Sequence, residues 1–255
     1  MMAFSDNALL RYDRQITLKD FDIEKQQRLA DAKVMIIGVG GLGCAVATYL
    51  ASSGVGQLTL VDPDTVSLSN LPRQILFSES DCGKAKVDVA RQQLALRNSA
   101  CQYLTLQAYV DDSIIWQQRF IQQDIIIDCT DHLLSRQQIN RLCFTTAIPL
   151  ISAGAIRMEG YVMSFTWQQN EPCYECLSHL FGESTGSCVE NGVMAPLTGV
   201  VGSLQAMEAL RYLTNYGCRT PGQFLLYDAM NFSFTTLKVR QNPNCKICAQ
   251  PQSKD

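Results

Sequence analysis

The stretch VMIIGVGGLGCAVATYLASSGVGQLTLVD, residues Val34–Asp62, carries no charged side chain before its last residue. A membrane span needs about 20 predominantly apolar residues, so length alone would allow one. Four glycines nevertheless crowd into positions 38–43, and each glycine in a helix interior costs about 1 kcal/mol relative to alanine. A short bulky run precedes these glycines and an alanine-rich run follows them, as a buried strand and a packed helix require. We therefore reject the membrane span and interpret the stretch as strand, glycine loop, helix, turn and strand.

The composition is that of a soluble globular protein. The chain has 255 residues, 47% hydrophobic and 18% charged, which is enough to bury the core of one large α/β domain. Its net charge of −3 argues against sequence-independent binding of nucleic acid, which needs a basic surface. The N-terminal segment has no apolar run after a basic start, and the chain has no polybasic or lipidation motif. We expect a cytoplasmic protein without nucleic-acid or membrane partners.

Strand-like and helix-like segments alternate over the first half of the chain, and strands whose two faces differ follow in the second half. This order predicts an α/β, Rossmann-like fold in which antiparallel strands continue a mostly parallel sheet. No linker-like stretch interrupts the chain, so we expect one domain over 1–255, with N-terminal helices in 1–31, a nucleotide-binding half in 32–154 and a second half in 155–255. Helices are expected within 5–31, at 42–51, 84–97 and 112–121, up to 146, and at 197–215; strands are expected at 34–37, 58–61, 102–107, 125–131, 150–152, 160–167, 224–227 and 232–239.

The glycine loop predicts a nucleotide site. Residues 38–43 fit G-x-G-x-x-G between a strand and a helix, where backbone amides and the helix dipole favour a phosphate. Asp62 ends the second strand, about where an acid would bind a ribose hydroxyl. The pattern alone does not separate NAD from ATP.

Neighbouring charges favour ATP. Asn70, Arg73 and Lys86 follow the second strand, and polyphosphate chemistry needs such cations or Mg²⁺, whereas redox use of a dinucleotide does not. Asp131 lies at the carboxyl end of the strand expected at 125–131 and could hold Mg²⁺, because ligands of open α/β sheets bind outside the carboxyl ends of the strands. Taken singly, the two cations could be solvated surface charges and Asp131 a helix N-cap; their collective placement favours a site.

Histidine is scarce, with only His132 and His179 in the chain. A hydrolytic triad or a Cys–His pair therefore has few possible bases. Adenylation of a carboxylate needs no such base, because the nucleophile is already ionised at neutral pH. His132 itself is expected at the start of a helix.

Two of the cysteine pairs predict a metal centre. Cys173-x-x-Cys176 and Cys245-x-x-Cys248 offer four thiolates, which suit a structural, tetrahedral zinc that pins the C-terminal segment as a knuckle. His179 could substitute for one ligand, and redox-active pairs are the rival interpretation. A further residue, Cys188, lies in a polar loop and is either an exposed nucleophile or an incidental thiol.

Several motifs together resemble the ubiquitin-activating-like adenylyltransferases of the MoeB/ThiF/HesA group, in order and over nearly the whole chain. Within this group the chain is most similar to the MoeB branch, the molybdopterin-synthase adenylyltransferases, in AIRMEG, CLSHLFGE, GVMAPLTGVVGSLQAMEAL and YDAM. The motifs shared with the whole group are RYDRQI (Arg11–Ile16), GVGGLG, LVDPDTVSLSNLPRQ (Leu60–Gln74), GKAKV (Gly83–Val87), DCTD (Asp128–Asp131), Arg136, PCYEC and NPNCKIC.

The resemblance implies an ATP- and Mg²⁺-dependent enzyme. The C-terminal Gly-Gly carboxylate of a small ubiquitin-fold sulfur carrier (MoaD-like) would attack the α-phosphate of ATP and give an acyl-adenylate and pyrophosphate. Residues 155–255 would then bind the carrier, and a separate sulfur donor enzyme would form the thiocarboxylate, since no sulfurtransferase domain follows Asp255. Adenylation of the thiamine-pathway carrier, an NAD-dependent oxidoreductase and a non-catalytic zinc scaffold are the alternatives.

The same resemblance implies roles for individual residues. Arg14 would reach the active site of a second protomer, which implies a homodimer. Two positions depart from the family, because His132 stands where Asn is frequent and Pro72 replaces a more usual polar residue. Cys188 matches a position that forms a covalent link to the carrier in the thiamine branch. The implied ligands are Gly41, Asp62 and His132 at the nucleotide; Ser69, Asn70, Leu71, Pro72, Arg73 and Lys86 along the phosphates; Asp131 at magnesium; and Cys173, Cys176, Cys245 and Cys248 at structural zinc.

Overall fold

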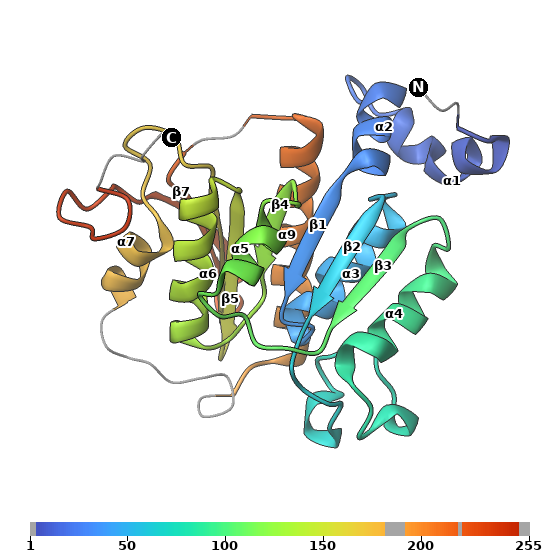
Figure 1. Ribbon diagram of the computed structural model, residues 1–255, viewed down its shortest axis with the longest axis horizontal. Helices are drawn as coiled ribbons and strands as arrows, with labels where there is room; N and C mark the ends of the chain where they lie inside the picture. Colours follow the sequence, from blue (N-terminus) through green and yellow to red (C-terminus); the bar gives the residue numbers. More distant parts are fainter. Residues whose placement is uncertain (1–3, 182–191, 219–220, 250–255) are drawn as a thin grey trace.

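The computed structural model describes residues 4–181, 192–218 and 221–249. These residues contain a single eight-stranded sheet with the strand order β3-β2-β1-β4-β5-β6-β7-β8 (Figure 1). The strands are β1 (Lys33–Ile37), β2 (Gln57–Val61), β3 (Gln102–Leu106), β4 (Ile125–Asp128), β5 (Leu150–Ile156), β6 (Glu159–Phe165), β7 (Gln223–Asp228) and β8 (Ser233–Lys238).

The sheet has a parallel and an antiparallel part. Strands β3, β2, β1, β4 and β5 are parallel, and β6, β7 and β8 extend the same sheet in antiparallel hairpins. In the parallel part, Ile37 pairs with both Val61 and Asp128, so β1, β2 and β4 end level with one another. The predicted fold class, a Rossmann-like sheet continued by antiparallel strands, is confirmed.

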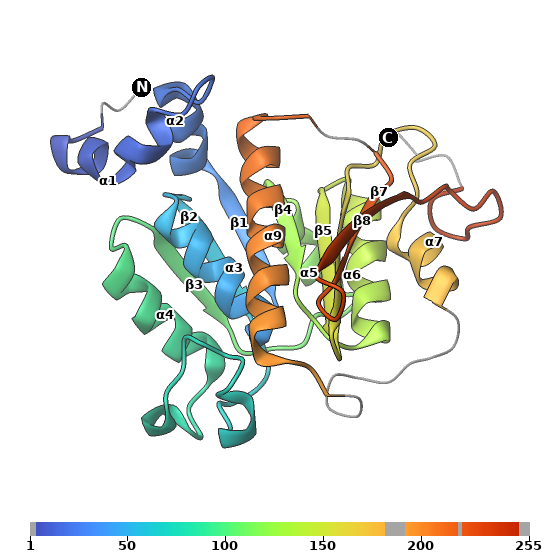
Figure 2. The ribbon, with the colours of Figure 1, turned by 180° about the vertical axis from the view of Figure 1, so that it is seen from behind.

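Helices cover both faces of the sheet. Helices α3 and α9 lie on one face and α5 and α6 on the other, as the two opposite views show (Figures 1 and 2). None of the helices in the described ranges is both long enough and apolar enough to cross a membrane. The helices are α1 (Asp6–Ile16), α2 (Ile23–Asp31), α3 (Gly41–Ser52), α4 (Lys86–Arg97), α5 (Ile114–Phe120), α6 (Leu133–Thr146), α7 (Tyr174–Ser178) and α9 (Ala195–Thr214), with short 3₁₀ helices η1 (Leu68–Asn70), η2 (Glu79–Asp81) and η3 (His179–Phe181).

The uncharged stretch of the sequence forms the centre of the core. Strand β1 is buried on both faces, with Val34 and Ile36 packed in the core on the α3 side and Met35 and Ile37 in the core on the opposite side. Most residues of helix α3 are buried because it packs on the sheet and against α9, which lies beside it on the same face. The two helices are so close that a Cβ on Gly202 of α9 would lie 2.7 Å from the Leu42 carbonyl oxygen. The lack of charge in this segment is thus explained by burial within a protein.

Both N-terminal helices begin where the sequence places polar caps. Ser5 caps α1 by accepting a hydrogen bond from the Ala8 amide, and Asp22 caps α2 in the same way through the Lys25 amide. The two helices lie beyond the amino ends of the parallel strands (Figure 1). They therefore stand at the end of the sheet opposite to the carboxyl ends of its strands.

Some predicted boundaries were wrong. Strand β4 ends at Asp128 and not at residue 131, because the Asp128 carboxylate accepts hydrogen bonds from the amide and hydroxyl of Thr130 and turns the chain. Helix α4 begins at Lys86 and not at residue 84, since the Val66 amide donates to the Lys84 carbonyl in a short antiparallel bridge. Strand β5 continues to Ile156 because it pairs with β6 along that length. Most of the predicted polar loop 181–192, with Cys188, lies outside the described residues.

Candidate functional site

The glycine loop joins β1 to α3 and forms the floor of the site. Gly38 has a φ of +91°, a conformation that favours glycine, and its amide donates to the Val61 carbonyl at 2.8 Å. A Cβ on Gly43 would lie only 1.9 Å from the Gly38 carbonyl oxygen. The first turn of α3 therefore packs directly on the loop that precedes it, as expected for a loop that brings backbone amides close to a phosphate.

A cavity of about 650 Å³ opens above this loop, at the carboxyl ends of β1, β2 and β4. A cavity of this volume lies in the usual range of a nucleotide or other small-molecule site. It brings together residues that are far apart in the sequence, from the glycine loop, the segment after β2, the start of α4 and the segment after β4. Of the predicted site residues, it is lined by Gly41, Asp62, Asn70, Arg73, Lys86, Asp131 and His132; Ser69, Leu71, Pro72 and Arg14 are not among its lining residues.

Asp62 is buried beneath the cavity and holds the glycine loop in place. One carboxylate oxygen accepts a hydrogen bond from the Val39 amide at 2.7 Å, and the other accepts one from the Asp64 amide at 2.9 Å. Burial raises the pKa of Asp62, an effect that the nearby ammonium of Lys86 opposes. A contact between Asp62 and a ribose stays a prediction, and the structure adds a second role that the sequence pattern did not indicate.

Lys86 is a buried cation held over the site by two carboxylates. Its Nζ lies 2.9 Å from an Asp64 carboxylate oxygen and 4.0 Å from one of Asp62, and its side chain is 6% exposed. The Lys86 amide donates to the Asp64 carbonyl, so backbone pairing fixes where this side chain begins. The interpretation of Lys86 as a solvated surface charge is therefore wrong. Arg73, half-buried on the cavity wall, donates from its guanidinium to the Ser69 carbonyl at 3.2 Å.

Asp131 and His132 form the outer rim of the cavity, and both are exposed. His132 occupies the N-cap position of α6, as expected for a residue at a helix start, and the interpretation of Asp131 as that cap is wrong. Within the described part of the chain, the Asp131 side chain has no hydrogen bond or ion pair that would occupy its oxygens. Its carboxylate is thus available at the mouth of the cavity.

The two C-x-x-C pairs meet in space, 72 residues apart in the sequence. The Sγ atoms of Cys173, Cys176, Cys245 and Cys248 all lie within 4.8 Å of one another, and all four residues are buried. The Cys173–Cys245 and Cys176–Cys248 sulfur pairs are 3.7 and 3.4 Å apart, close to the roughly 3.8 Å that tetrahedral Zn–S bonds of about 2.3 Å produce. The donor set therefore fits zinc. His179 lies outside this cluster, where it faces Glu175 at 3.6 Å.

Comparison with known proteins identifies the family. The model of the ThiF family matches residues 12–247 of this chain. The chain belongs to the ThiF family. A molybdopterin-synthase adenylyltransferase of Salmonella typhimurium is 50% identical over 250 residues, 98% of this chain and 100% of that protein. The sulfur carrier protein ThiS adenylyltransferase of Escherichia coli is 39% identical over 245 residues, 96% of each chain. A crystal structure of E. coli MccB with ATP has a TM-score of 0.80 at 25% identity and covers 93% of this chain and 74% of that one.

Arg14 stands apart from the cavity of its own ThiF-family chain. It lies in the last turn of α1, beyond the amino ends of the strands, whereas the cavity lies at their carboxyl ends (Figure 1). Its side chain is 96% exposed, and the carboxylate of Asp13 is 3.9 Å away. A role of Arg14 at the cavity of a second protomer stays a prediction.

Three further residues shape the ThiF-family site and were not among the predicted site residues. Thr198, in the first turn of α9, lies 3.0 Å from where a Cβ on Gly41 would be. Gln205 of α9 donates to the Asp128 carbonyl at 2.8 Å and accepts from the Cys129 thiol. Arg136 of α6 is buried and donates to the Thr130 carbonyl and the Tyr161 hydroxyl. Only Arg136 had a signal in the sequence, through the family resemblance.

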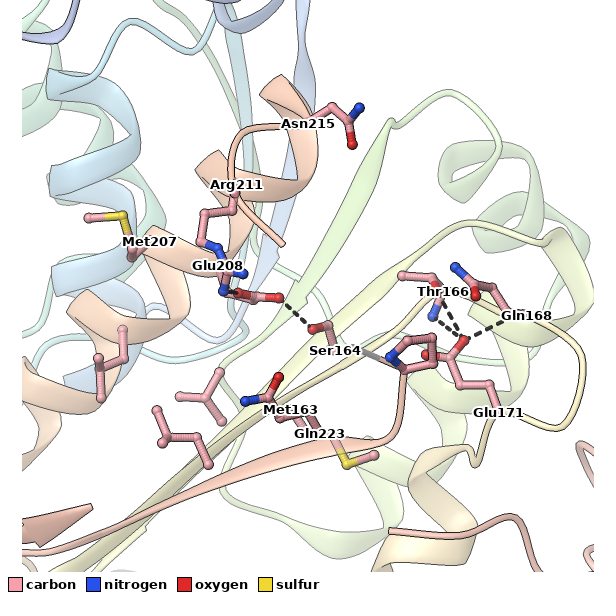
Figure 3. Close-up of a pocket in the computed structure, with 15 residues that line it drawn as sticks. Met163, Ser164, Thr166, Gln168, Glu171, Met207, Glu208, Arg211, Asn215 and Gln223 are labelled. Atoms are coloured by element: carbon pink, nitrogen blue, oxygen red, sulfur yellow. Dashed lines mark hydrogen bonds and ion pairs between the residues drawn. The ribbon is translucent and has the colours of Figure 1, made fainter. Parts of the chain in front are cut away.

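A second cavity, of about 350 Å³, lies between α9 and strands β6 and β7 (Figure 3). Its charged side chains are engaged in hydrogen bonds or an ion pair. Glu208 accepts a hydrogen bond from Ser164 and pairs with Arg211, and Glu171 accepts from Thr166 and from the Gln168 amide. None of the residues predicted for nucleotide or metal binding lines it. The cavity at the glycine loop is therefore the candidate active site.

Proposed function

We propose that this protein is a molybdopterin-synthase adenylyltransferase. It uses ATP to adenylate the C-terminal Gly-Gly carboxylate of a small ubiquitin-fold sulfur carrier, the small subunit of molybdopterin synthase, which prepares the carrier for thiocarboxylate formation by a separate sulfur donor enzyme. One observation carries the proposal: a ThiF-family chain gathers its glycine loop, Arg73, Lys86 and Asp131 around one cavity. A redox dinucleotide has no need of this set of charges.

The residues of the cavity suit attack on a phosphate. A carboxylate oxygen of the carrier forms the bond to the α-phosphorus, and the bond from that phosphorus to the bridging oxygen breaks, so that pyrophosphate leaves. Lys86 and Arg73 supply positive charge where negative charge accumulates on the phosphates. The ammonium of Lys86 is positioned before ATP arrives, because Asp64 and Asp62 hold it. The ionised carboxylate nucleophile needs no general base to abstract a proton.

Magnesium and zinc would have different roles. Asp131 would hold Mg²⁺, which typically takes one or two carboxylates together with substrate phosphates. Bound there, Mg²⁺ would neutralise phosphate charge. The four cysteines would hold zinc with no position left for substrate, and a closed site of this kind is structural. Zinc would tie residues 173–176 to the C-terminal segment.

The body of the carrier would dock on the antiparallel end of the sheet. The register of β5, β6, β7 and β8 places the turn between β7 and β8 level with the carboxyl ends of the parallel strands, where the cavity opens. This turn and edge strand expose Met230, Phe232 and Phe234, of which Phe232 is 87% exposed. Exposed apolar groups on an edge strand mark an interaction surface. Phe232→Ser should raise the KM for the carrier and leave ATP affinity unchanged, whereas Leu96→Ser, also at an exposed apolar residue but on α4, should alter neither.

Arg14 would complete the site of the partner in a homodimer. A complementation experiment tests this with two inactive variants, Arg14→Ala and Lys86→Ala. In a mixed dimer, one site has Lys86 of its own chain and Arg14 of the other, so mixing the two variants should restore about a quarter of the wild-type activity. If Arg14 acted within its own chain, the mixture would stay inactive.

The choice of carrier rests on degree of similarity. The chain is 50% identical to a molybdopterin-synthase adenylyltransferase and 39% identical to a ThiS adenylyltransferase. The test is ATP–pyrophosphate exchange by the purified protein with Mg²⁺, with a molybdopterin-type or a thiamine-type carrier added in parallel. Exchange with the first alone supports the proposal, and exchange with the second alone assigns the enzyme to the thiamine pathway. Absence of exchange with both, in a folded protein that binds ATP, would refute carrier adenylation by this chain.

A further inference from the structure

Four buried side-chain atoms have no hydrogen-bond partner among the residues that the structure describes: Thr59 Oγ1, Gln74 Oε1, Gln123 Oε1 and Asn140 Nδ2. A buried polar atom without a partner costs about 1–3 kcal/mol, so native proteins keep few of them. Of the four residues, only Gln74 lines the cavity at the glycine loop. This coincidence separates Gln74 from the others.

The backbone fixes Gln74 in its place. Its backbone N–H donates to the carbonyls of Asn70 and Leu71, at 3.1 and 3.3 Å, at the end of the turn that follows η1. The residue is 3% exposed. Its side-chain Nε2 lies 3.6 Å from the position that a Cβ on Gly40 would occupy, so the side-chain amide lies against the glycine loop. The neighbouring Arg73 lines the same cavity.

We propose that Gln74 is a further substrate-contacting residue of the adenylation reaction, and that Oε1 accepts a hydrogen bond from the bound substrate. The inference rests on the proposed function, because it presumes that ATP and the carrier tail meet in this cavity. Oε1 is only an acceptor, so the ligand group must be a donor. Two donors fit this chemistry: a ribose hydroxyl of the nucleotide, and a backbone N–H of the Gly-Gly tail. In either case, the cost of burying Oε1 is recovered when substrate binds.

Stability and activity should respond in opposite directions, which a merely structural residue would not do. Gln74→Met keeps the volume of the side chain and removes both polar atoms. Without substrate, the variant should have the Tm of the wild type or a higher one, because an unsatisfied acceptor has been removed. Its kcat/KM in ATP–pyrophosphate exchange should fall by about tenfold or more, because one hydrogen bond to substrate is lost.

Gln123→Met is the matched control. Gln123 is also a buried glutamine with an unpartnered Oε1, but it follows α5 at the amino end of β4 and lines none of the cavities described above. Its Nε2 donates to the Arg119 carbonyl at 3.3 Å, so its replacement should lower Tm slightly, and exchange should remain at the wild-type level.

Calorimetric titration of ATP without carrier identifies the donor. Weaker ATP binding by Gln74→Met, by the same factor as the loss in exchange, assigns the donor to the nucleotide. Unchanged ATP binding with a raised KM for the carrier assigns it to the tail. Wild-type exchange and wild-type ATP binding in Gln74→Met would overturn the proposal, as would a lowered Tm with unchanged kinetics. If the wild-type protein itself showed no exchange, the proposed function would fail, and the ATP titration would still decide whether Gln74 contacts the nucleotide.

Discussion

Gly43→Ala tests the packing on which the whole site depends. The added methyl group would lie 1.9 Å from the Gly38 carbonyl oxygen and 2.9 Å from its carbonyl carbon. Both are backbone atoms, so no side chain can rotate to relieve the clash. Since a Cβ atom essentially never approaches another heavy atom within 3.0 Å, the loop or the start of α3 must move by about 1.1 Å.

This displacement sets the expected size of the effect. Forcing an extra methyl group into a packed core costs about 1–3 kcal/mol, which corresponds to a decrease in Tm of roughly 2–12 °C for a chain of this length. A displacement of about 1 Å in a catalytic site can cost about 100-fold in rate. We therefore expect Gly43→Ala to lower exchange about 100-fold, more than its loss of stability would explain at a temperature where the variant is folded.

Calorimetry and ATP–pyrophosphate exchange on the same samples check both expectations. Gly199→Ala is the control, because Gly199 lies within α9 and a Cβ there would meet no heavy atom within 4 Å. Alanine is preferred to glycine in a helix interior by about 1 kcal/mol, so this variant should be slightly more stable and fully active. A Gly43→Ala protein with the Tm and exchange rate of the wild type would refute the close packing of α3 on its loop.

Three further predictions concern the metals and the acid range. Asp131→Asn should lower exchange by about 100-fold or more with a change in Tm below about 2 °C, because the side chain is exposed and no described residue contacts it through a hydrogen bond or ion pair; near-wild-type exchange would rule out a role at magnesium. Chelation of zinc should lower Tm before it lowers exchange at 25 °C, because the four cysteines join two distant segments; zinc content, Tm and exchange are measured together, and a loss of exchange at unchanged Tm would contradict a structural site. The pKa of Asp81 is lowered from 3.8, chiefly by the hydrogen bond from the Ser78 hydroxyl and then by that from Lys84, so its stabilising effect is present above pH 3.8 and is lost as the pH falls through the lowered pKa. Urea unfolding should therefore show Asp81→Asn less stable than the wild type at pH 7 and the two equally stable in strong acid; a difference that does not depend on pH would contradict this origin.

The sequence was sufficient for features that depend on local spacing. The glycine loop could be predicted because a strand, a close turn and a helix follow one another within 30 residues, and each requires a distinct residue type. The four cysteines could be paired because two short knuckles leave few other uses for four thiols. Alternation of apolar and polar residues indicated that the second half is antiparallel, and β6, β7 and β8 indeed extend the sheet.

Contacts between distant segments could not be predicted in this way. Thr198 covers Gly41 from 157 positions away, and no pattern in either segment marks the approach. Lys86 and Asp131 were placed near the glycine loop by sheet topology, but the burial of Lys86 between two carboxylates depends on the backbone pairing of residues 64–66 with 83–86. Asp62 was assigned to a ribose on the basis of its position at the end of a strand. Its two hydrogen bonds from backbone amides depend on the fold of the loop around it.

Helix α9 connects the two halves of the molecule physically. Its first turn touches Gly41 through Thr198, and one side chain, Gln205, reaches the carbonyls of Asp128 and Ile151. The same helix packs on β5 and β6, which continue into the hairpin with the exposed aromatic residues. The helix cannot shift relative to this hairpin without also moving the wall of the nucleotide cavity, because packed interiors do not deform continuously. Docking of a carrier on β7 and β8 would thus act on a packed body that already includes the cavity.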